Sequence, residues 1–320
     1  MSATSVSRVE PGSFDWAASA GVAAEVRRVV DAAAEQDRTA PLDEATLLGL
    51  RHRGLHDSAL WVAVTGEGDT RSVVGFALAD PQPGPTDAVE VNLVVHPAAR
   101  GHGMARALAE GVLEAYPSAR VSAWSHGNHP AAAALASALG FHRVRDLWVM
   151  RRSLRAELPP VRDVEGVDVR AFEPGRDEEA FLAVNAEAFA HHPEQGRMTI
   201  EDLRQRESEP WFDPAGFFLA VRGEEVLGYH WTKVHDEDPP YGEVYVVGVA
   251  PAAQGMGLGK VLTLTGLHHL RDQGLEQVIL YVEADNAPAV AVYAGLGFTH
   301  ADEDTHVMYA RSAGVSASRP

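Results

Sequence analysis

The stretch Val244-Tyr-Val-Val-Gly-Val-Ala-Pro-Ala-Ala-Gln-Gly-Met-Gly-Leu-Gly259 decides the fold of this chain. An apolar, β-branched segment of strand character runs into a glycine-rich turn, and an apolar helical pattern follows. Glycine permits tight turns and close approach of the backbone, so successive N–H groups can point at one anion where the helix begins. The turn therefore predicts a cradle for a diphosphate.

A second copy of this pattern lies in the first half of the chain, at Val91-Asn-Leu-Val-Val-His-Pro-Ala-Ala-Arg-Gly-His-Gly-Met-Ala105. Both copies fit (Arg or Gln)-x-x-Gly-x-(Gly or Ala). Landmarks outside the two turns recur at offsets of 153 to 158 residues; they are Gly75 and Gly228, Glu90 and Glu243, Asn128 and Asn286, and Gly140 and Gly297. A nearly constant offset indicates internal duplication. We expect two related domains, at residues 14–156 and 165–316.

The composition narrows the class of protein. Of the 320 residues 46 % are hydrophobic, and no apolar run is long enough to cross a bilayer. The N-terminus has no hydrophobic signal core, so we expect a cytoplasmic protein. The absence of cysteine excludes disulfides, thiolate metal sites and a cysteine acyl-enzyme. The net charge of −18 argues against a nucleic-acid partner, and backbone amides in a cradle can still hold an anionic cofactor.

Hydrophobic patterning predicts the same α/β order in each half. We expect a three-stranded antiparallel meander, the glycine turn, a helix that crosses over, and a parallel strand. The meander strands are expected at residues 61–64, 73–78 and 90–95, and again at 217–221, 226–234 and 243–249. Residues 1–13 and 312–320 are expected to be a flexible lead and tail.

Strand, cradle, helix, strand and then Asn286, Tyr293 and Leu296-Gly-Phe298 together resemble the GNAT family of acetyl-CoA-dependent N-acetyltransferases. The resemblance covers most of both halves. It implies two tandem GNAT domains, each a mixed, mostly antiparallel twisted sheet flanked by helices. A Rossmann site is the competing interpretation, but the turns do not continue as Gly-x-Gly-x-x-Gly and the chain does not begin with strand, loop and helix.

The resemblance also implies acetyl-CoA as cosubstrate, no metal, and two sets of contacts to the coenzyme. In the second half these are Val247, Gly248, Val249, Gln254, Gly255, Met256, Gly257, Leu258, Gly259, Lys260, Asn286, Ala287, Pro288, Ala289, Val290 and Ala291. In the first half they are Leu93, Val94, Val95, Gly101, His102, Gly103, Met104, Ala105 and Arg106. Asn286 would serve equally well as the N-cap of a helix.

Two residues of the second half are the candidate catalytic pair. Glu243 stands where a GNAT enzyme places its general base, and Tyr293 stands where many members place the acid for the departing thiolate. The alternatives are a solvent-facing glutamate and a buried aromatic that only packs. In the first half Leu135 replaces the tyrosine, and leucine cannot donate a proton. We expect direct transfer in the second half, and a first half that binds acetyl-CoA but transfers acetyl poorly.

Several strings, among them Trp211-Phe-Asp-Pro214 and Tyr229-His-Trp-Thr-Lys-Val-His235, resemble one tandem branch of that family. The resemblance implies acetylation of the cysteinyl amine of Cys-GlcN-Ins, a cationic amine on a polyhydroxylated pseudodisaccharide. The implied substrate contacts are Glu44, which would reach across the domain junction, and Glu194, Lys233, Glu243 and Tyr281.

Other functions stay open at this stage. The alternatives are a GNAT enzyme that acts on another amine, such as an aminoglycoside, and a non-catalytic acyl-CoA sensor. The pairs His191-His192 and His126/His129 lack a third ligand at metal-site spacing and are expected to be loop histidines. Duplication within one chain favours a monomer.

Overall fold

The computed structural model describes residues 4–66, 68–82, 87–190 and 195–312. Its contacts divide the chain into two compact units. Unit 1 comprises residues 1–147 and 302–320, and unit 2 comprises residues 148–301. Strands β6 (His142–Ser153) and β12 (Thr299–Arg311) therefore each contribute residues to both units. No helix among the described residues has the length and apolar character needed to cross a membrane.

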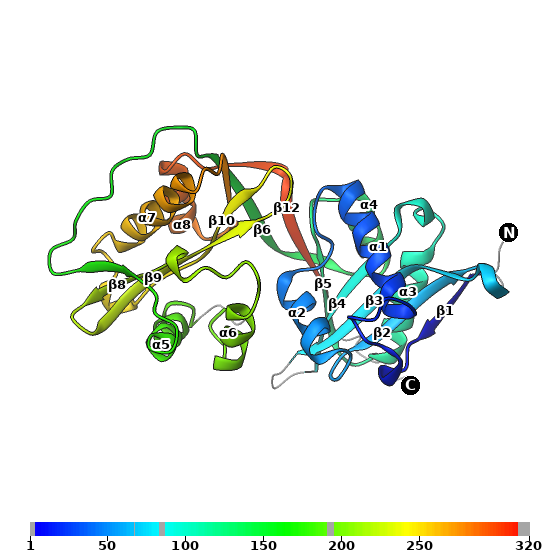
Figure 1. Cartoon of the computed structure of the whole chain (residues 1–320). Coiled ribbons are helices and arrows are strands. Elements are labelled where there is room, and N and C mark those ends of the chain that lie inside the picture. The colour runs from blue at the N-terminus through cyan, green and yellow to red at the C-terminus, as the bar shows by residue number, and fades with distance from the viewer. Residues whose placement is uncertain (1–3, 67, 83–86, 191–194, 313–320) are drawn as a thin grey trace, which may run out of the picture. The chain divides into compact units, whose positions relative to one another are not determined.

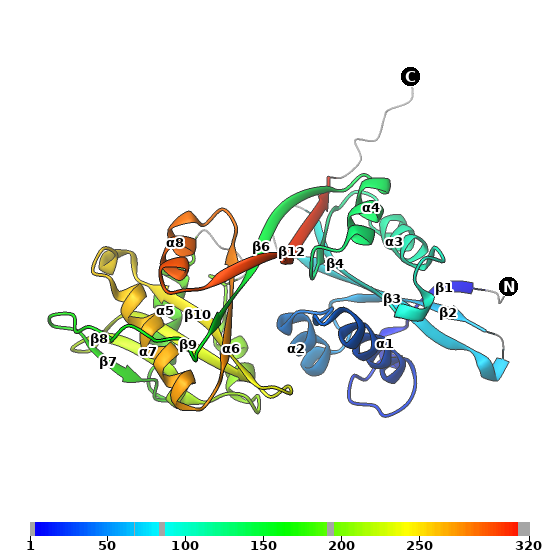
Figure 2. The ribbon, with the colours of Figure 1, turned by 90° about the horizontal axis from the view of Figure 1, so that it is seen from above.

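Unit 1 is a mixed sheet with helices on both faces (Figure 1, Figure 2). The strand order is β1-β2-β3-β4-β5-β12, with β4 and β5 parallel and the other neighbours antiparallel. One face packs against α1 and the other against α3, in separate apolar clusters. The elements are β1 (Thr4–Arg8), α1 (Val22–Asp37), α2 (Glu44–Arg53), β2 (Ala59–Thr65), β3 (Ser72–Gln82), β4 (Ala88–Val95), α3 (Met104–Ala115), β5 (Arg120–Ser125) and α4 (Pro130–Ala138).

Unit 2 repeats this order with the strands arranged β6-β11-β10-β9-β8-β7. Helix α5 packs on one face of β9 and β10 and helix α7 on the other. The elements are β7 (Asp168–Ala171), α5 (Glu178–Ala188), α6 (Ile200–Glu207), β8 (Phe217–Arg222), β9 (Glu225–His235), β10 (Tyr241–Val249), α7 (Leu258–Asp272), β11 (Gln277–Glu283) and α8 (Ala287–Gly295).

The predicted meander, crossover helix and parallel strand are confirmed in both units. Helix α2 begins after Asp43, whose carboxylate accepts from the N–H of Thr46 at 2.7 Å. Helix α6 begins with a capping box between Thr199 and Asp202. These caps satisfy N–H groups that the first helical turn leaves without partners, and so they fix where the two helices begin.

The prediction of a flexible lead over residues 1–13 was wrong. Residues Thr4–Arg8 form β1, which pairs with β2 through partners such as Val6 and Ala63. The segment is short and rich in serine, so its own sequence carries little strand signal. Its hydrogen bonds come from the open edge of β2, a partner far along the chain. The predicted tail falls, after Ser312, outside the described residues, and the domain limits at 14–156 and 165–316 stay a prediction.

Helix α7 lies unusually close to β9 because Gly266 faces the sheet. A Cβ built on Gly266 would overlap the ring of the fully buried His230 and would lie 2.9 Å from Cγ2 of Thr232. The His230 ring is fixed in turn, because its Nδ1 bonds to the carbonyl oxygen of Leu262 at 2.8 Å. Glycine is thus required here by packing, although it weakens a helix interior.

We predict that Gly266→Ala destabilises the protein by about 1–3 kcal/mol, because the added methyl overpacks the contact between α7 and β9. The matched control is Gly295→Ala in α8, where the built Cβ meets nothing within 4 Å. Alanine should stabilise that helix by about 0.5–1 kcal/mol. Urea unfolding followed by circular dichroism measures both variants. Equal midpoints for the two would contradict the packing argument.

Candidate functional site

Strands β10 and β11 separate soon after they begin. Their parallel pairing, within the described part of unit 2, covers Gly242 to Val244 against Val278 to Leu280. On its other side β10 stays paired with β9, but the register shifts between Val244 and Val246, so Tyr245 is the extra residue of a β-bulge. A bulge bends its strand and re-aims the neighbouring side chains. Residues 245–249 are therefore left with one edge unpaired by β11.

The edge that β11 leaves is where the sequence predicts the coenzyme. Gly248 has to be glycine here, because a built Cβ would lie 2.6 Å from Cε1 of Tyr229. That ring is itself held in place, since its hydroxyl donates to Oδ1 of Asn185 at 2.6 Å. The backbone of Val247–Val249 thus follows one defined path along the separated edge.

Each glycine turn leads directly into a helix. Gly255 and Gly257 have φ of 86° and 78°, and Gly101 and Gly103 have φ of 78° and 83°. These left-handed values strain any residue with a side chain. The N-caps of α7 and α3 are Gly257 and Gly103, and neither provides a side-chain cap hydrogen bond. The first N–H groups of both helices are thus available to an anion at the positive end of the helix dipole.

The two cradles differ in how their cations are placed. In unit 1, Arg100 forms two bonds of 2.7 Å to the carboxylate of Asp37, and this guanidinium lowers the pKa of Asp37. In unit 2 the equivalent residue is the neutral Gln254, and cations come from elsewhere. Arg162 lies so close that a Cβ on Gly257 would overlap its Nη2, and Nη2 of Arg222 lies 3.7 Å from Sδ of Met256.

The two units also differ in the strand before the cradle. In unit 1 the register of β3 and β4 runs without a shift from Gly75 and Val95 to Gln82 and Ala88. Strand β4 still parts from β5 after Val91 and Ala123. Unit 1 therefore keeps the separated strands and the cradle, while its strand has no bulge matching the one at Tyr245.

Glu243 is buried, which rules out the alternative of a solvent-facing glutamate. Its Oε2 lies 2.6 Å from Nε2 of His235 on β9. It pairs across the strands with Lys233 and Ile279, so these side chains share one face of the sheet. Tyr281 follows Ile279 by two residues on the same face and is 43 % exposed. Lys233, Glu243 and Tyr281, three of the predicted substrate contacts, thus come from neighbouring strands.

Lys233 is held over aromatic rings. Its Nζ lies 4.4 Å from the ring centroid of Trp211 and 5.5 Å from that of Tyr245. Attraction between an ammonium and the ring faces orients the side chain within this group. The bulge residue Tyr245 therefore helps to fix the cation beside Glu243.

Tyr293 lies on α8, with its ring 5.9 Å from that of Phe298. Burial raises the pKa of its phenol to about 12, so the hydroxyl keeps its proton at neutral pH. Asn286 is the N-cap of α8, and its Oδ1 accepts from the N–H of Ala289 at 3.2 Å. Its role as a cap is confirmed, and its contact with the coenzyme stays a prediction.

The remaining predicted residues fall elsewhere. Glu44 is the first residue of α2 in unit 1. Glu194 and the pair His191-His192 lie outside the described residues. His126 is partly buried against His306, with 3.1 Å between the two Nδ1 atoms. Among the described residues, no three His, Cys, Asp or Glu side chains converge as a metal site would require.

Sequence reasoning missed His235, Arg162 and Arg222. His235 lies eight residues before Glu243, a spacing without meaning until β9 and β10 form an antiparallel pair. Arg162 belongs to the charged, proline-containing segment between the repeats, whose composition is typical of a linker. The two arginines stand on segments far from the glycine motif, so no local pattern linked them to it.

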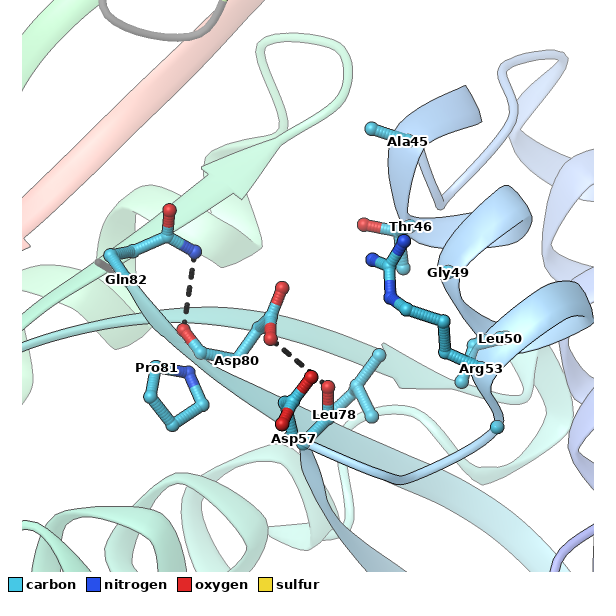
Figure 3. A pocket seen from close by; sticks show the side chains of 12 residues that line it. Ala45, Thr46, Gly49, Leu50, Arg53, Asp57, Leu78, Asp80, Pro81 and Gln82 are labelled. Carbon is cyan, nitrogen blue, oxygen red and sulfur yellow. Dashed lines mark hydrogen bonds between the residues drawn. The ribbon is translucent and has the colours of Figure 1, made fainter. Parts of the chain in front are cut away.

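Sequence reasoning also missed a pocket of about 640 Å³ in unit 1, between α2 and the end of β3 (Figure 3). Its polar walls carry Arg53 on α2 and Asp57 and Asp80 on the opposite side. Burial raises the pKa of Asp80, whose carboxylate accepts from Oγ of Ser58 at 3.0 Å. The residues predicted for the site do not line this pocket.

Comparison with known proteins identifies the family. The model of the Acetyltransferase (GNAT) family matches residues 26–141 and again 183–298. A mycothiol acetyltransferase of a Nocardioides species is 52 % identical over 303 residues, covering 90 % of this chain and 96 % of that protein. The mycothiol acetyltransferase of Thermobispora bispora is 50 % identical over 290 residues, covering 89 % and 95 %.

The solved structure of a tandem GNAT protein from the clavulanic acid biosynthesis pathway is also similar. It superposes with a TM-score of 0.66 at 25 % identity, covering 90 % of this chain and 94 % of that one. The predicted fold class, two tandem α/β GNAT domains, is thereby confirmed. The two cradles, the separated strands and the two family matches lead to one conclusion: the chain is an acetyltransferase of the GNAT family and belongs among the mycothiol acetyltransferases.

Proposed function

We propose that this enzyme moves acetyl from acetyl-CoA to the cysteinyl amine of Cys-GlcN-Ins, the last step in making mycothiol, and that the chemistry takes place in unit 2. Relatives at about half identity over nine-tenths of the chain are named mycothiol acetyltransferase, which supports this proposal. The observation that carries the assignment to unit 2 is the buried carboxylate of Glu243 on the strand that bulges and parts from its neighbour.

Glu243 is the proposed general base. The acceptor amine reaches the enzyme mostly as an ammonium, since α-amines titrate near about 7.7–8.0. Glu243 takes one proton, and the nitrogen lone pair then attacks the thioester carbonyl carbon. The carbon–nitrogen bond forms, the carbon–sulfur bond breaks, coenzyme A leaves as a thiolate, and the nitrogen releases its second proton to solvent to give the amide. Backbone N–H groups of Val247–Val249, on the separated edge, are proposed to hold the pantetheine arm and polarise the thioester carbonyl.

Tyr293 is the proposed donor to the departing sulfur. Its pKa of about 12 keeps the proton in place throughout the working range. A free thiol has a pKa near about 8.5, so the phenol holds its proton more tightly than the thiol would. Its contribution therefore begins as a hydrogen bond to the developing thiolate. In unit 1 Leu135 on α4 offers no such donor, which supports a non-catalytic role for that unit.

The acceptor contacts are proposed for Glu44, Glu194, Lys233, Glu243 and Tyr281. Carboxylates suit the amine, while the hydroxyl groups of the pseudodisaccharide need paired donors and acceptors. We also propose that the enzyme works in the cytoplasm and as a monomer. Assaying Cys-GlcN-Ins, cysteine and aminoglycosides side by side with acetyl-CoA tests the acceptor. Acetylation of an aminoglycoside but not of Cys-GlcN-Ins would refute the assignment.

We predict that Glu243→Gln lowers kcat/KM at pH 7 by about 10²- to 10⁴-fold, because the amide cannot take the proton from the amine. The defect should shrink as pH rises past about 8, where the acceptor becomes neutral without help. Thiol release measured from pH 6 to 9 tests this. The control is Glu90→Gln on β4 of unit 1, which should leave turnover unchanged. Undiminished turnover of Glu243→Gln at pH 6 would show that Glu243 is not the general base.

We predict that Tyr293→Phe lowers kcat by about 10- to 100-fold with little change in the KM for acetyl-CoA, because the lost bond forms as the sulfur departs. A phenol with a pKa of about 12 stays protonated up to pH 10. The rate profiles of wild type and variant should therefore have the same shape between pH 7 and 10. An alkaline decline present in wild type and abolished in the variant would show that the phenol titrates in that range.

We predict that Arg162→Ala raises the KM for acetyl-CoA by about 3- to 10-fold, because an exposed guanidinium beside the cradle of unit 2 is lost. The effect should diminish in 0.5 M salt, where exposed charges are screened. Arg271→Ala is the control, since Arg271 pairs with Asp272 at the far end of α7 and carries the same charge. Equal KM values for the two variants would show that Arg162 does not contribute to coenzyme binding.

A further inference from the structure

His235 is placed as a partner of Glu243. The two atoms in contact are Nε2 of the ring and Oε2 of the carboxylate, 2.6 Å apart. An ionised carboxylate can only accept hydrogen bonds, so the proton of this bond belongs to Nε2. Both the neutral ring protonated at Nε2 and the imidazolium carry that proton. The bond therefore survives when the ring itself gains a proton.

The ring has little freedom to turn away. His235 pairs across the strands with Tyr241, and the two rings stack with centroids 4.4 Å apart at an interplanar angle of 10°. At the opposite edge of the ring, Nδ1 lies 3.9 Å from Oε2 of Glu237. Stacking on Tyr241 limits the rotation of the ring and so keeps Nε2 directed at Glu243.

Because Glu243 is buried, its hydrogen bond to His235 is important for its proposed role as a base. The side chains of Glu243, His235 and Glu237 are 8 %, 19 % and 60 % exposed, so the carboxylate is the least hydrated of the three. A buried carboxylate has few water molecules to bind, so a hydrogen bond from the protein satisfies one of its oxygens and fixes its direction. One oxygen, Oε2, is held by His235, which leaves Oε1 for the amine.

Other ionisable groups lie near His235 and Glu243. Lys233 neighbours Glu243 across β9 and β10. Tyr241 lies under the imidazole ring, and burial together with the charges of Glu237 and Glu243 raises the pKa of its phenol to about 12. Arg151 on β6 acts on Tyr241 in the opposite direction. Tyr241 is therefore neutral through the working range and adds no charge to the pair.

We propose that His235 is the positioning residue of the base: its Nε2–H holds one oxygen of the Glu243 carboxylate and so aims the other at the acceptor amine. This rests on the proposed function of Glu243 and goes beyond it, because it assigns to a second residue the orientation of the base.

The test compares kcat/KM from pH 5.5 to 9 for His235→Phe and His235→Gln. Phenylalanine keeps a ring to stack on Tyr241 but has no donor, whereas the glutamine amide nitrogen can reach the place of Nε2. His235→Phe should lose about 10-fold in kcat/KM at pH 7, with the loss in kcat and little change in the KM for acetyl-CoA, because the base is no longer oriented. His235→Gln should recover most of the rate.

A purely structural role would lower the rate of both variants in parallel at every pH, and that result would overturn the proposal. If the phenylalanine variant does not fold, His235→Asn replaces it, because the shorter amide cannot reach Oε2 and should reproduce the loss. Wild-type values of kcat/KM at every pH for both His235→Asn and His235→Gln would also overturn the proposal.

A failure of the proposed role of Glu243 can be distinguished from a failure of the proposed role of His235. In the Glu243→Gln background, His235→Phe should cause little further loss, because the two residues act as a unit. If Glu243→Gln is itself fully active, the base assignment fails. If Glu243→Gln is impaired while His235→Phe matches wild type at all pH values, the base stands and the positioning role of His235 is refuted.

Discussion

The structure of unit 2 depends on a parallel strand pair that is interrupted early. Pairing of β10 with β11 ends at Val244 and Leu280, and the bulge at Tyr245 then turns β10 along a path that β11 does not follow. A buried strand edge normally has to satisfy its N–H and C=O groups. An edge left without its neighbour is therefore available to a ligand with an amide-rich arm, such as the pantetheine of coenzyme A.

The same interruption positions the proposed base. Glu243 lies within the last paired segment, one residue before pairing ends, so it is held by strands on both sides. The bulge residue Tyr245 contributes a ring beneath Lys233. The cradle at the start of α7 follows soon after β10, so the proposed diphosphate site and the proposed base are linked by one short strand. Rigid elements on both sides give the defined geometry that the proposed direct transfer requires.

The two repeats differ at the residues proposed for catalysis. Unit 1 keeps the glycine turn and the parting of β4 from β5, but its strand has no matching bulge and Leu135 takes the place of Tyr293. Its cradle arginine, Arg100, is bound to Asp37, whereas in unit 2 arginines from distant segments flank the turn. These differences support the proposal that unit 1 binds the coenzyme and that unit 2 carries out the transfer.

The sequence alone determined the duplication, the order of the elements and both glycine turns, because these rest on local patterns: glycines at fixed spacing and alternating apolar residues. The choice of Glu243 and Tyr293 rests on the resemblance to a family and stays a proposal. Tertiary structure decided what depends on partners far along the chain. Strand β1 exists because the edge of β2 pairs with it, and Arg162 reaches a cradle almost a hundred residues away. His235 meets Glu243 only because antiparallel pairing brings β9 against β10, and a spacing of eight residues carries no signal until the two strands pair.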